Sequence, residues 1–417
     1  MEPLQTPPAE HKRAVDTSRF LWCAGIEDTF IADPFPQTGK TLDEYELTGH
    51  YEEWRTDCDR VAGLGIDALR WGIPWYKVNP AKNKWDWSFP DQVIPYLIEE
   101  KKVAPILDLM HYGTPRWLEK AFIDPDYPAW VEEYTARVIE RYRPWVSLVT
   151  PFNEPHTACE FAGRRGEWPP YLTGYDGYVA VLRGIIYGSL RQGKLLREAG
   201  IHRVEIECSG GAWATESRYE ADAFRERILQ SMYFDFLTGN MAALEPVHQF
   251  LLDNGMRPGD LEFFAENGLP LDIMGINYYP QFSFQELYTD TEGRTARRNH
   301  QEWTGDLKRI IRERYEKYRC PLMITETSVR DEPEMKLRWL RESSAVAVEL
   351  HKAGIPLLGY TWFPIIDMYD WEYRINPGPK ENFTARFGFW DQERRENPAA
   401  AEYRNIIASY KDTCHAG

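Results

Sequence analysis

The chain has 417 residues and carries 49 Lys and Arg against 65 Asp and Glu, so its formal net charge is −16 at pH 7. A hydrophobic content of 43% with 27% charged residues is typical of a folded globular protein. No stretch approaches the roughly 20 apolar residues of a membrane helix. The acidic balance, with no Lys/Arg-rich stripe to offset it, would repel a phosphate backbone. We therefore expect neither membrane insertion nor nucleic-acid binding.

The cysteines and the N-terminal segment indicate the setting of the protein. Six cysteines are scattered without a CxxC pair or a His/Cys cluster, so we expect no metal site and no cofactor. Residues 1–16 are polar and lack the apolar run of a secretory signal. We expect a flexible tail over 1–16, one catalytic domain over 17–417, and a cytoplasmic location. The sequence leaves the oligomeric state open.

Eight short apolar runs of β-type residues follow the tail. Each is continuous rather than alternating, which is typical of parallel strands buried on both faces. In chain order they are FLWCAGI (20–26), DALRWGIPW (67–75), VAPILDLM (103–110), SLVTPFNEP (147–155), RVEIECSG (203–210), DIMGINYYP (272–280), PLMITETS (321–328) and LLGYTWFPII (357–366).

Amphipathic segments with apolar residues three and four apart lie between these runs, as at 51–65 and 130–142. Gly65, Gly200 and Gly354 each stand just before a strand, where a left-handed residue ends the preceding helix. Eight strands with room for a helix after each predict an α/β fold, a single (β/α)₈ or TIM barrel. A doubly wound open sheet is the competitor, but no phosphate-binding glycine loop follows the first strand.

Two glutamates stand at the ends of strands in this predicted barrel. The fourth run ends in Asn153-Glu154 and the seventh in Glu326. In a barrel, catalytic residues lie where strands end, at one mouth. Two carboxyl groups facing each other across a pocket are the minimal apparatus for cleaving a glycosidic bond, because one donates a proton while the other stabilises or captures the oxocarbenium-like centre.

Other polar and aromatic residues end the remaining runs. Arg70 is embedded in apolar sequence, where a guanidinium needs a carboxylate partner. Such a pair can serve stability alone, and a single histidine or tryptophan at a strand end is often a packing residue. The further candidates for substrate contacts are His111, Asn277, Tyr279, Trp362, Asp370 and Trp371.

The segments TPFNEP, ITET, GINYY, RWGIPW and RFGFWD together resemble the signature segments of the family 1 glycoside hydrolases, the β-glucosidase family within a (β/α)₈ clan of retaining enzymes. The resemblance covers nearly the whole chain. It implies that Glu154 is the acid/base and Glu326 the nucleophile. It also implies that Arg70 and Tyr279 hold Glu326 ionised and oriented.

The resemblance further assigns the sugar contacts. It implies that Asn153 binds the 2-hydroxyl and that His111 binds another hydroxyl of a small-molecule glycoside. Which aromatic stacks on the sugar stays open, because the family's tryptophan aligns with Phe363 while Trp362 stands one place earlier.

The chain departs from the family at other sugar-binding positions. A glutamine that grips the 3- and 4-hydroxyls aligns with Phe30, with Glu27, Asp28 and Thr29 beside it, and Tyr112 stands in place of a tryptophan. A glutamate for the 4- and 6-hydroxyls is replaced by Asp370. We therefore expect an unmodified β-glucoside to be a poor substrate and a glycoside that differs at C4 or C6 to be preferred, unless a neighbour of Phe30 replaces the glutamine.

The leading interpretation is a retaining β-glycosidase that acts through a covalent glycosyl-enzyme intermediate. A transglycosylase would use the same intermediate but pass the sugar to an acceptor other than water. A catalytically inactive carbohydrate-binding barrel is the third interpretation, and the retained glutamates with Arg70 and Tyr279 argue against it. A metal-dependent barrel hydrolase is disfavoured because the first strand lacks a His-x-His motif.

Overall fold

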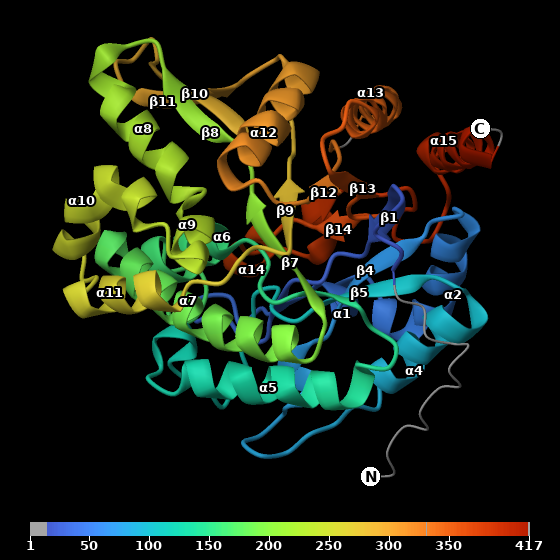
Figure 1. Ribbon diagram of the computed structural model, residues 1–417, viewed down its shortest axis with the longest axis horizontal. Helices are drawn as coiled ribbons and strands as arrows, with labels where there is room; N and C mark the ends of the chain where they lie inside the picture. Colours follow the sequence, from blue (N-terminus) through green and yellow to red (C-terminus); the bar gives the residue numbers. More distant parts are fainter. Residues whose placement is uncertain (1–14, 331, 416–417) are drawn as a thin grey trace.

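The computed structural model describes residues 15–330 and 332–415; most of the tail predicted over 1–16 lies outside these ranges. Each of the eight predicted runs overlaps one strand of a closed, all-parallel barrel, so the predicted (β/α)₈ fold is confirmed (Figure 1). Around the barrel the strand order is β1-β13-β12-β9-β7-β6-β5-β4. The strands are β1 (Leu21–Gly25), β4 (Ala68–Gly72), β5 (Ala104–Asp108), β6 (Leu148–Thr150), β7 (His202–Cys208), β9 (Ile273–Asn277), β12 (Leu322–Thr327) and β13 (Leu357–Trp362).

The strands are continuous in sequence because both of their faces are buried. Along β1, Leu21 and Cys23 belong to a small central cluster with residues of other barrel strands. Trp22, between them, belongs to the larger core under the helices, where its ring lies 5.9 Å from that of Tyr403. Successive side chains thus alternate between the barrel interior and the helix layer, and both environments are apolar.

Helices cover the outside of the barrel (Figure 1). The predicted segments 51–65 and 130–142 correspond to α2 and α5, and Gly65, Gly200 and Gly354 have the expected left-handed φ of +77°, +72° and +88°. The longer helices are α2 (His50–Gly63), α5 (Tyr127–Tyr142), α7 (Gly174–Glu198), α8 (Glu220–Leu229), α11 (Pro258–Asn267), α12 (Trp303–Tyr318), α13 (Pro333–Lys352) and α15 (Pro398–His415). No helix in the described ranges is long and apolar enough to cross a membrane.

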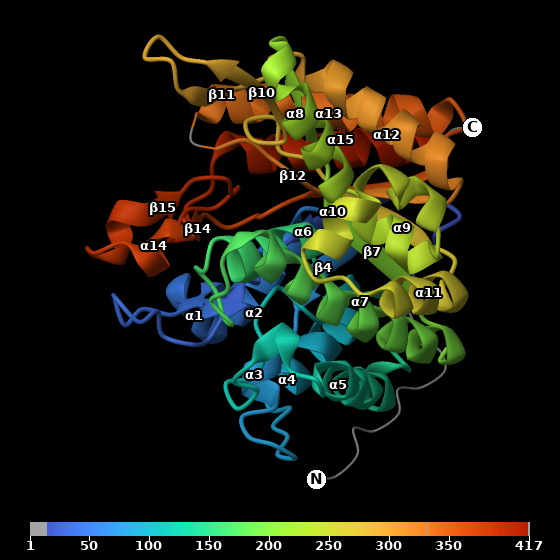
Figure 2. The ribbon, with the colours of Figure 1, turned by 90° about the vertical axis from the view of Figure 1, so that its left-hand side faces the viewer.

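Short elements after the carboxyl ends of the strands build the walls around one mouth of the barrel, on the left in Figure 2. The segment 281–303, whose shape the sequence does not indicate, contains two strands of a sheet ordered β11-β10-β8. The strands of these walls are β2 (Phe30–Ile31), β3 (Leu42–Asp43), β8 (Gly211–Ala214), β10 (Phe284–Thr289), β11 (Thr295–Asn299), β14 (Met368–Tyr369) and β15 (Thr384–Ala385). The short helices are α1 (Glu44–Leu47), α3 (Trp75–Val78), α4 (Pro90–Pro95), α6 (Pro155–Ala158), α9 (Met232–Thr238), α10 (His248–Asp253) and α14 (Glu372–Ile375).

Candidate active site

Glu326 lies on β12, and both of its carboxylate oxygens accept hydrogen bonds. Arg70, on β4, donates through Nη1 to Oε1, and the Tyr279 hydroxyl donates to Oε2 over 2.6 Å. The residue is only 4% exposed. Together the guanidinium and the phenol hold this buried carboxylate in one orientation. The structure therefore brings together the three residues that the resemblance grouped.

Arg70 has the carboxylate partner that its apolar surroundings required. Its second nitrogen, Nη2, donates to Asp108 at the end of β5 and, over 2.7 Å, to Oδ1 of Asn153. The guanidinium thus joins β4 to the ends of β5, β6 and β12. Sequence analysis did not single out Asp108, although its place as a buried acid closing the run VAPILDLM was the available signal.

Glu154 follows β6 in a left-handed conformation, with φ of +42°. Its Oε1 accepts from the amide of Asn277 over 2.8 Å, and its Oε2 accepts from Thr157 over 2.7 Å and from the Tyr112 hydroxyl over 3.2 Å. Burial raises the pKa of Glu154, and the negative charge of Glu326 raises it further. The two carboxyl groups therefore lie in different environments: Glu326 accepts from a guanidinium and a phenol, whereas Glu154 accepts only from neutral groups and has a raised pKa.

His111 lies beside this pair, at the start of the loop after β5. Its Nδ1 is 2.7 Å from a carboxylate oxygen of Asp28 and 3.3 Å from one of Asp108, and its Nε2 is 3.1 Å from the amide nitrogen of Asn153. Burial lowers the pKa of His111, but the two carboxylates outweigh it and raise the pKa. Phe363 stacks nearly parallel to the imidazole, with ring centroids 6.1 Å apart.

Asp28, Asp108 and His111 form the one group of described residues whose ligand atoms lie close enough together to hold a metal ion. Arg70, however, donates to Asp108 and lies 3.5 Å from His111 Nδ1. A metal ion in that position would face the fixed positive charge of the guanidinium. The arrangement fits an ion-pair network that orients His111 better than a metal centre.

Three of the predicted substrate contacts, Trp362, Asp370 and Trp371, have partners other than the two glutamates. Trp362 does not reach the glutamates, because its ring stacks on Phe389 at 5.0 Å and its Nε1 donates to the backbone of Phe387. Asp370 lies at the partly exposed rim, where Arg330 pairs with it at 2.6 Å. Trp371 lies closer, since its ring packs edge-on against Tyr112, 5.6 Å away.

The position aligned with the family's glutamine does not face the site either. Phe30 lies in β2 and packs edge-on against Tyr45 in the core, with ring centroids 4.9 Å apart. Glu27 lies near His111 instead, with Oε1 3.9 Å from Nε2, and it is 5% exposed. Both acidic neighbours of Phe30 thus lie beside His111, Glu27 on the Nε2 side and Asp28, at 2.7 Å, on the Nδ1 side. In the sequence, the signal for these two residues was their position as an acidic pair, Glu27-Asp28, directly after the first predicted strand.

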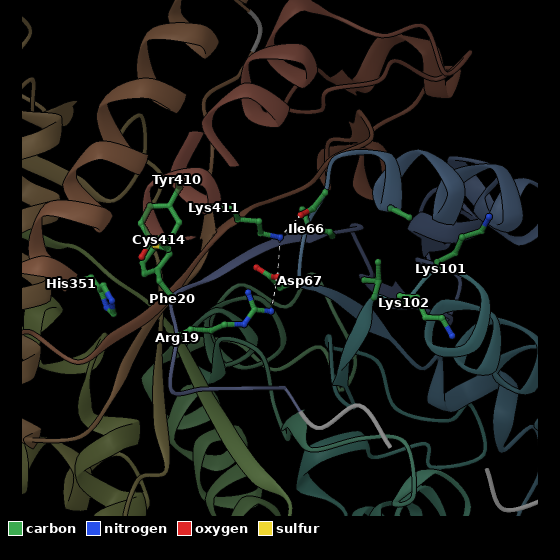
Figure 3. A pocket seen from close by; sticks show the side chains of 13 residues that line it. Arg19, Phe20, Ile66, Asp67, Lys101, Lys102, His351, Tyr410, Lys411 and Cys414 are labelled. Carbon is green, nitrogen blue, oxygen red and sulfur yellow. Dashed lines mark hydrogen bonds and ion pairs between the residues drawn. The ribbon is translucent and has the colours of Figure 1, made fainter. Parts of the chain in front are cut away.

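A cavity of about 630 Å³ lies at the opposite end of the barrel, beside residues that precede β1, β4 and β5 (Figure 3). Two of its cationic groups share one acid: Asp67 binds Arg19 at 2.8 Å and Lys411 at 3.0 Å. Because the carboxyl ends of the strands are far from this cavity, it has no part in the site described above.

Comparisons with known proteins agree with this geometry. The model of Glycosyl hydrolase family 1 matches residues 23–191. Beta-glucosidase A of Thermotoga maritima is 22% identical, with 86% of each chain covered. The galactolipid galactosyltransferase SFR2 of Arabidopsis thaliana is 24% identical and covers 93% of this chain and 63% of its own.

The fold comparison gives the same answer. The beta-glucosidase of Thermotoga maritima in complex with noeuromycin superimposes with a TM-score of 0.79 at 18% identity, over 93% of this chain and 97% of that chain. The matched family model covers the segments that carry Arg70, His111 and Glu154. Over residues 23–191 the chain is thus similar to glycosyl hydrolase family 1, and over most of its length it is similar to beta-glucosidases.

Proposed function

We propose that the protein is a retaining β-glycosidase that hydrolyses a β-linked glycoside through a covalent glycosyl-enzyme intermediate. The observation that supports this most directly is the asymmetry of the two glutamates. Glu326 has both oxygens bound to donors, one of them a guanidinium, whereas the pKa of Glu154 is raised by burial and by the charge of Glu326. A nucleophile and a general acid need these opposite environments.

The proposed reaction has two steps. A carboxylate oxygen of Glu326 attacks the anomeric carbon while the glycosidic C–O bond breaks, and Glu154 gives its proton to the departing oxygen. Glu154, now ionised, then takes a proton from water as the water oxygen attacks the same carbon and the bond to Glu326 breaks. Both glutamates return to their starting protonation states, and the chemistry requires no cofactor.

Trapping of the intermediate tests this proposal. A 2,4-dinitrophenyl 2-deoxy-2-fluoro-β-glycoside reacts at the nucleophile, and its ester with Glu326 is expected in the peptide mass spectrum. Proton NMR of early hydrolysis should show a β-configured first product. An α-configured first product would show inversion and refute the mechanism, and complete absence of turnover and labelling across a sugar panel would favour a carbohydrate-binding barrel.

Transfer to an acceptor other than water is a second candidate function. Its support is the likeness to the galactolipid galactosyltransferase over 93% of this chain. The same glycosyl-enzyme would then pass its sugar to an alcohol. Adding a glycoside or glycerol acceptor and measuring the ratio of transfer product to free sugar decides between the two candidates.

The sugar is expected to differ from plain glucose. Arg330 already occupies the carboxylate of Asp370, and Phe30 is packed away from the site. The kcat/KM of nitrophenyl β-glucoside should therefore be exceeded by that of a glycoside altered at C4 or C6. A value near 10⁴ M⁻¹s⁻¹ or above for the plain glucoside, as the best of the panel, would contradict this.

A further inference from the structure

Tyr112 is a buried phenol whose hydroxyl lies beside Glu154. It follows His111 in the loop after β5 and is 1% exposed. Its ring centroid lies 4.9 Å from that of Trp168 and 5.6 Å from that of Trp371. Packing against these large rings holds the phenol in place, so its hydroxyl has a fixed direction.

The hydrogen bonds around Tyr112 determine which way each proton points. The guanidinium of Arg70 has donors only, so the Asn153 atom that lies 2.7 Å from Nη2 must be the carbonyl oxygen Oδ1. The amide nitrogen of Asn153 therefore lies on the other side, where it donates to the Tyr112 hydroxyl over 2.9 Å. The phenol accepts that bond and gives its own proton to Oε2 of Glu154 over 3.2 Å.

This chain of hydrogen bonds joins the two glutamates. Arg70 also donates to Oε1 of Glu326, so the order is Glu326, Arg70, Asn153, Tyr112 and Glu154. All of these side chains are buried, and a fully satisfied buried network is rigid. The chain ends in a guanidinium at Glu326 but in a neutral hydroxyl at Glu154. A neutral donor orients a carboxyl group without bringing a positive charge to it.

The two oxygens of Glu154 are not equivalent. Among the described residues, Oε2 accepts from both Tyr112 and Thr157, whereas Oε1 accepts from Asn277 alone. A carboxylate oxygen has about two lone-pair sites, so Oε2 is filled and Oε1 keeps one site free. The proton of the acid can therefore lie on Oε1 without breaking any of the three hydrogen bonds.

We propose that Tyr112 is a positioning residue for Glu154, whose hydroxyl keeps Oε2 as an acceptor and leaves Oε1 to give and take the proton. This rests on the proposed function, because it takes Glu154 to be the acid and the base. In the family that the chain resembles, a tryptophan stands at this position. An indole nitrogen donates but cannot accept, so a tryptophan could not continue the chain from Asn153.

Tyr112→Phe tests the proposal, because it removes the hydroxyl and keeps the ring. Labelling of Glu326 by the dinitrophenyl fluoroglycoside needs no proton on the leaving group, so its rate should stay within about threefold of the wild type. Unchanged labelling also shows that the variant is folded. Reaction of the labelled enzyme with water needs Glu154 as the base, so reactivation should slow by about tenfold or more. Azide attacks without a base and should remove most of this difference.

Tyr134→Phe is the matched control for this substitution. Tyr134, on α5, is also fully buried, and its hydroxyl donates over the same 3.2 Å, but to the backbone carbonyl of Ile73. Its labelling and reactivation should match those of the wild type. If Tyr112→Phe reactivates as fast as this control, or if it slows labelling and reactivation alike, the proposal is wrong.

Carbon-13 NMR of labelled glutamate tests the contact without catalysis. A hydroxyl that donates to a carboxylate stabilises the charged form, so Tyr112→Phe should raise the pKa of Glu154 by roughly half a unit or more. Tyr134→Phe should leave it unchanged. Both substitutions keep the titratable groups that act on Glu154, which are Glu326, His111, Glu207, Cys208 and Tyr279. An unchanged pKa in Tyr112→Phe would overturn the proposal.

These outcomes are separable from those of the proposed function. If the fluoroglycoside fails to label Glu326 while Tyr112→Phe raises the pKa of Glu154, the glycosidase proposal fails and the positioning of Glu154 by Tyr112 stands. If Glu326 is labelled and Tyr112→Phe changes neither the pKa nor the reactivation rate, the reverse holds.

Discussion

The two sides of the barrel mouth differ in how completely their charges are paired. Around Glu326, Arg70 and Tyr279 occupy both carboxylate oxygens, and Asp108 and Asn153 occupy the other guanidinium nitrogen. In the segment after β1, pairing is less complete: Glu27 accepts from Thr29 and lies 3.9 Å from His111 Nε2, and Glu44 Oε1 is buried without a hydrogen bond in the described residues. Full pairing favours one fixed arrangement for chemistry, whereas burial with few partners raises the pKa of Glu27 and of Glu44.

The largest effect is expected from a substitution of Glu326. Glu326→Ala removes the proposed nucleophile, so turnover of a dinitrophenyl glycoside should fall at least about 1,000-fold. Sodium azide should restore part of it by attacking in place of the carboxylate. Glu334→Gln, an exposed acid on α13, is the control and should keep wild-type rates. Near-normal turnover by Glu326→Ala would mean that the nucleophile lies elsewhere.

Removing the guanidinium of Arg70 should lower both the activity and the stability of the protein. Arg70→Met leaves Glu326 buried without its cationic partner and Asp108 with His111 alone, and breaking a buried ion pair costs about 3–5 kcal/mol. Urea unfolding measures this loss. Arg312→Met, on the exposed face of α12, is the matched control and should change the free energy of unfolding by less than about 0.5 kcal/mol. Equal stabilities for the two variants would contradict the central role of Arg70.

The acid and the nucleophile should be coupled through charge. Because the charge of Glu326 helps to raise the pKa of Glu154, Glu326→Gln should lower that pKa. Carbon-13 NMR of labelled glutamate measures the change directly. In the wild type, activity should accordingly be lost on the alkaline side as Glu154 loses its proton. A pKa of Glu154 that stays the same or rises in Glu326→Gln would rule out the coupling.

Glu154→Gln should discriminate between leaving groups. Dinitrophenolate departs without a proton, so its glycoside should keep substantial turnover in the first step, whereas an alkyl glycoside should lose nearly all. The measurement is the slope of log kcat/KM against leaving-group pKa, which should steepen. An unchanged slope would remove Glu154 from the acid role.

Substitutions of the two neighbouring aromatic residues Trp362 and Phe363 should distinguish a packing role from a substrate-binding role. Trp362→Ala removes a ring stacked on Phe389 in the core and should cost about 3–5 kcal/mol of stability. Phe363→Ala removes the ring that stacks on His111 and should mainly raise KM, because that ring lines the site. Urea unfolding and steady-state kinetics of both variants give the comparison. The reverse pattern would make Trp362 the sugar contact after all.

The smallest effect is expected on the contribution of Glu27 to stability. The folded pKa of Glu27 is about 7, above the ordinary value of 4.5, so the folded state binds more protons than the unfolded state between these values. The contribution of Glu27 to stability is therefore present below about pH 4.5 and is lost as the pH rises through 7, by at most roughly 3 kcal/mol. Glu27→Gln should flatten this decline between pH 5 and 8 in urea unfolding. A wild-type decline that Glu27→Gln retains would show that Glu27 does not titrate in this range.

The sequence by itself determined the barrel and the residues that meet around Glu326 at its mouth. Eight continuous apolar runs require strands buried on both faces, and the residues that close them, including Arg70, Glu154 and Glu326, meet at one mouth because all eight strands are parallel. No knowledge of loop shape is needed for that step. Asp108 was accessible by the same reasoning, since a guanidinium in an apolar strand requires a buried acid on a neighbouring strand.

Only the tertiary structure decided which side chains line the rest of the mouth. Trp362 and Phe363 are adjacent, and the pleat of β13 with the path after it turns one ring to the core and the other to His111. Glu27 rather than Phe30 faces the site because the chain after β1 bends so that Phe30 pairs within β2 and β3. Glu27 and Glu44 both hydrogen-bond to Thr29 although 17 positions separate them, since loop geometry, not residue pattern, brings them to the same residue.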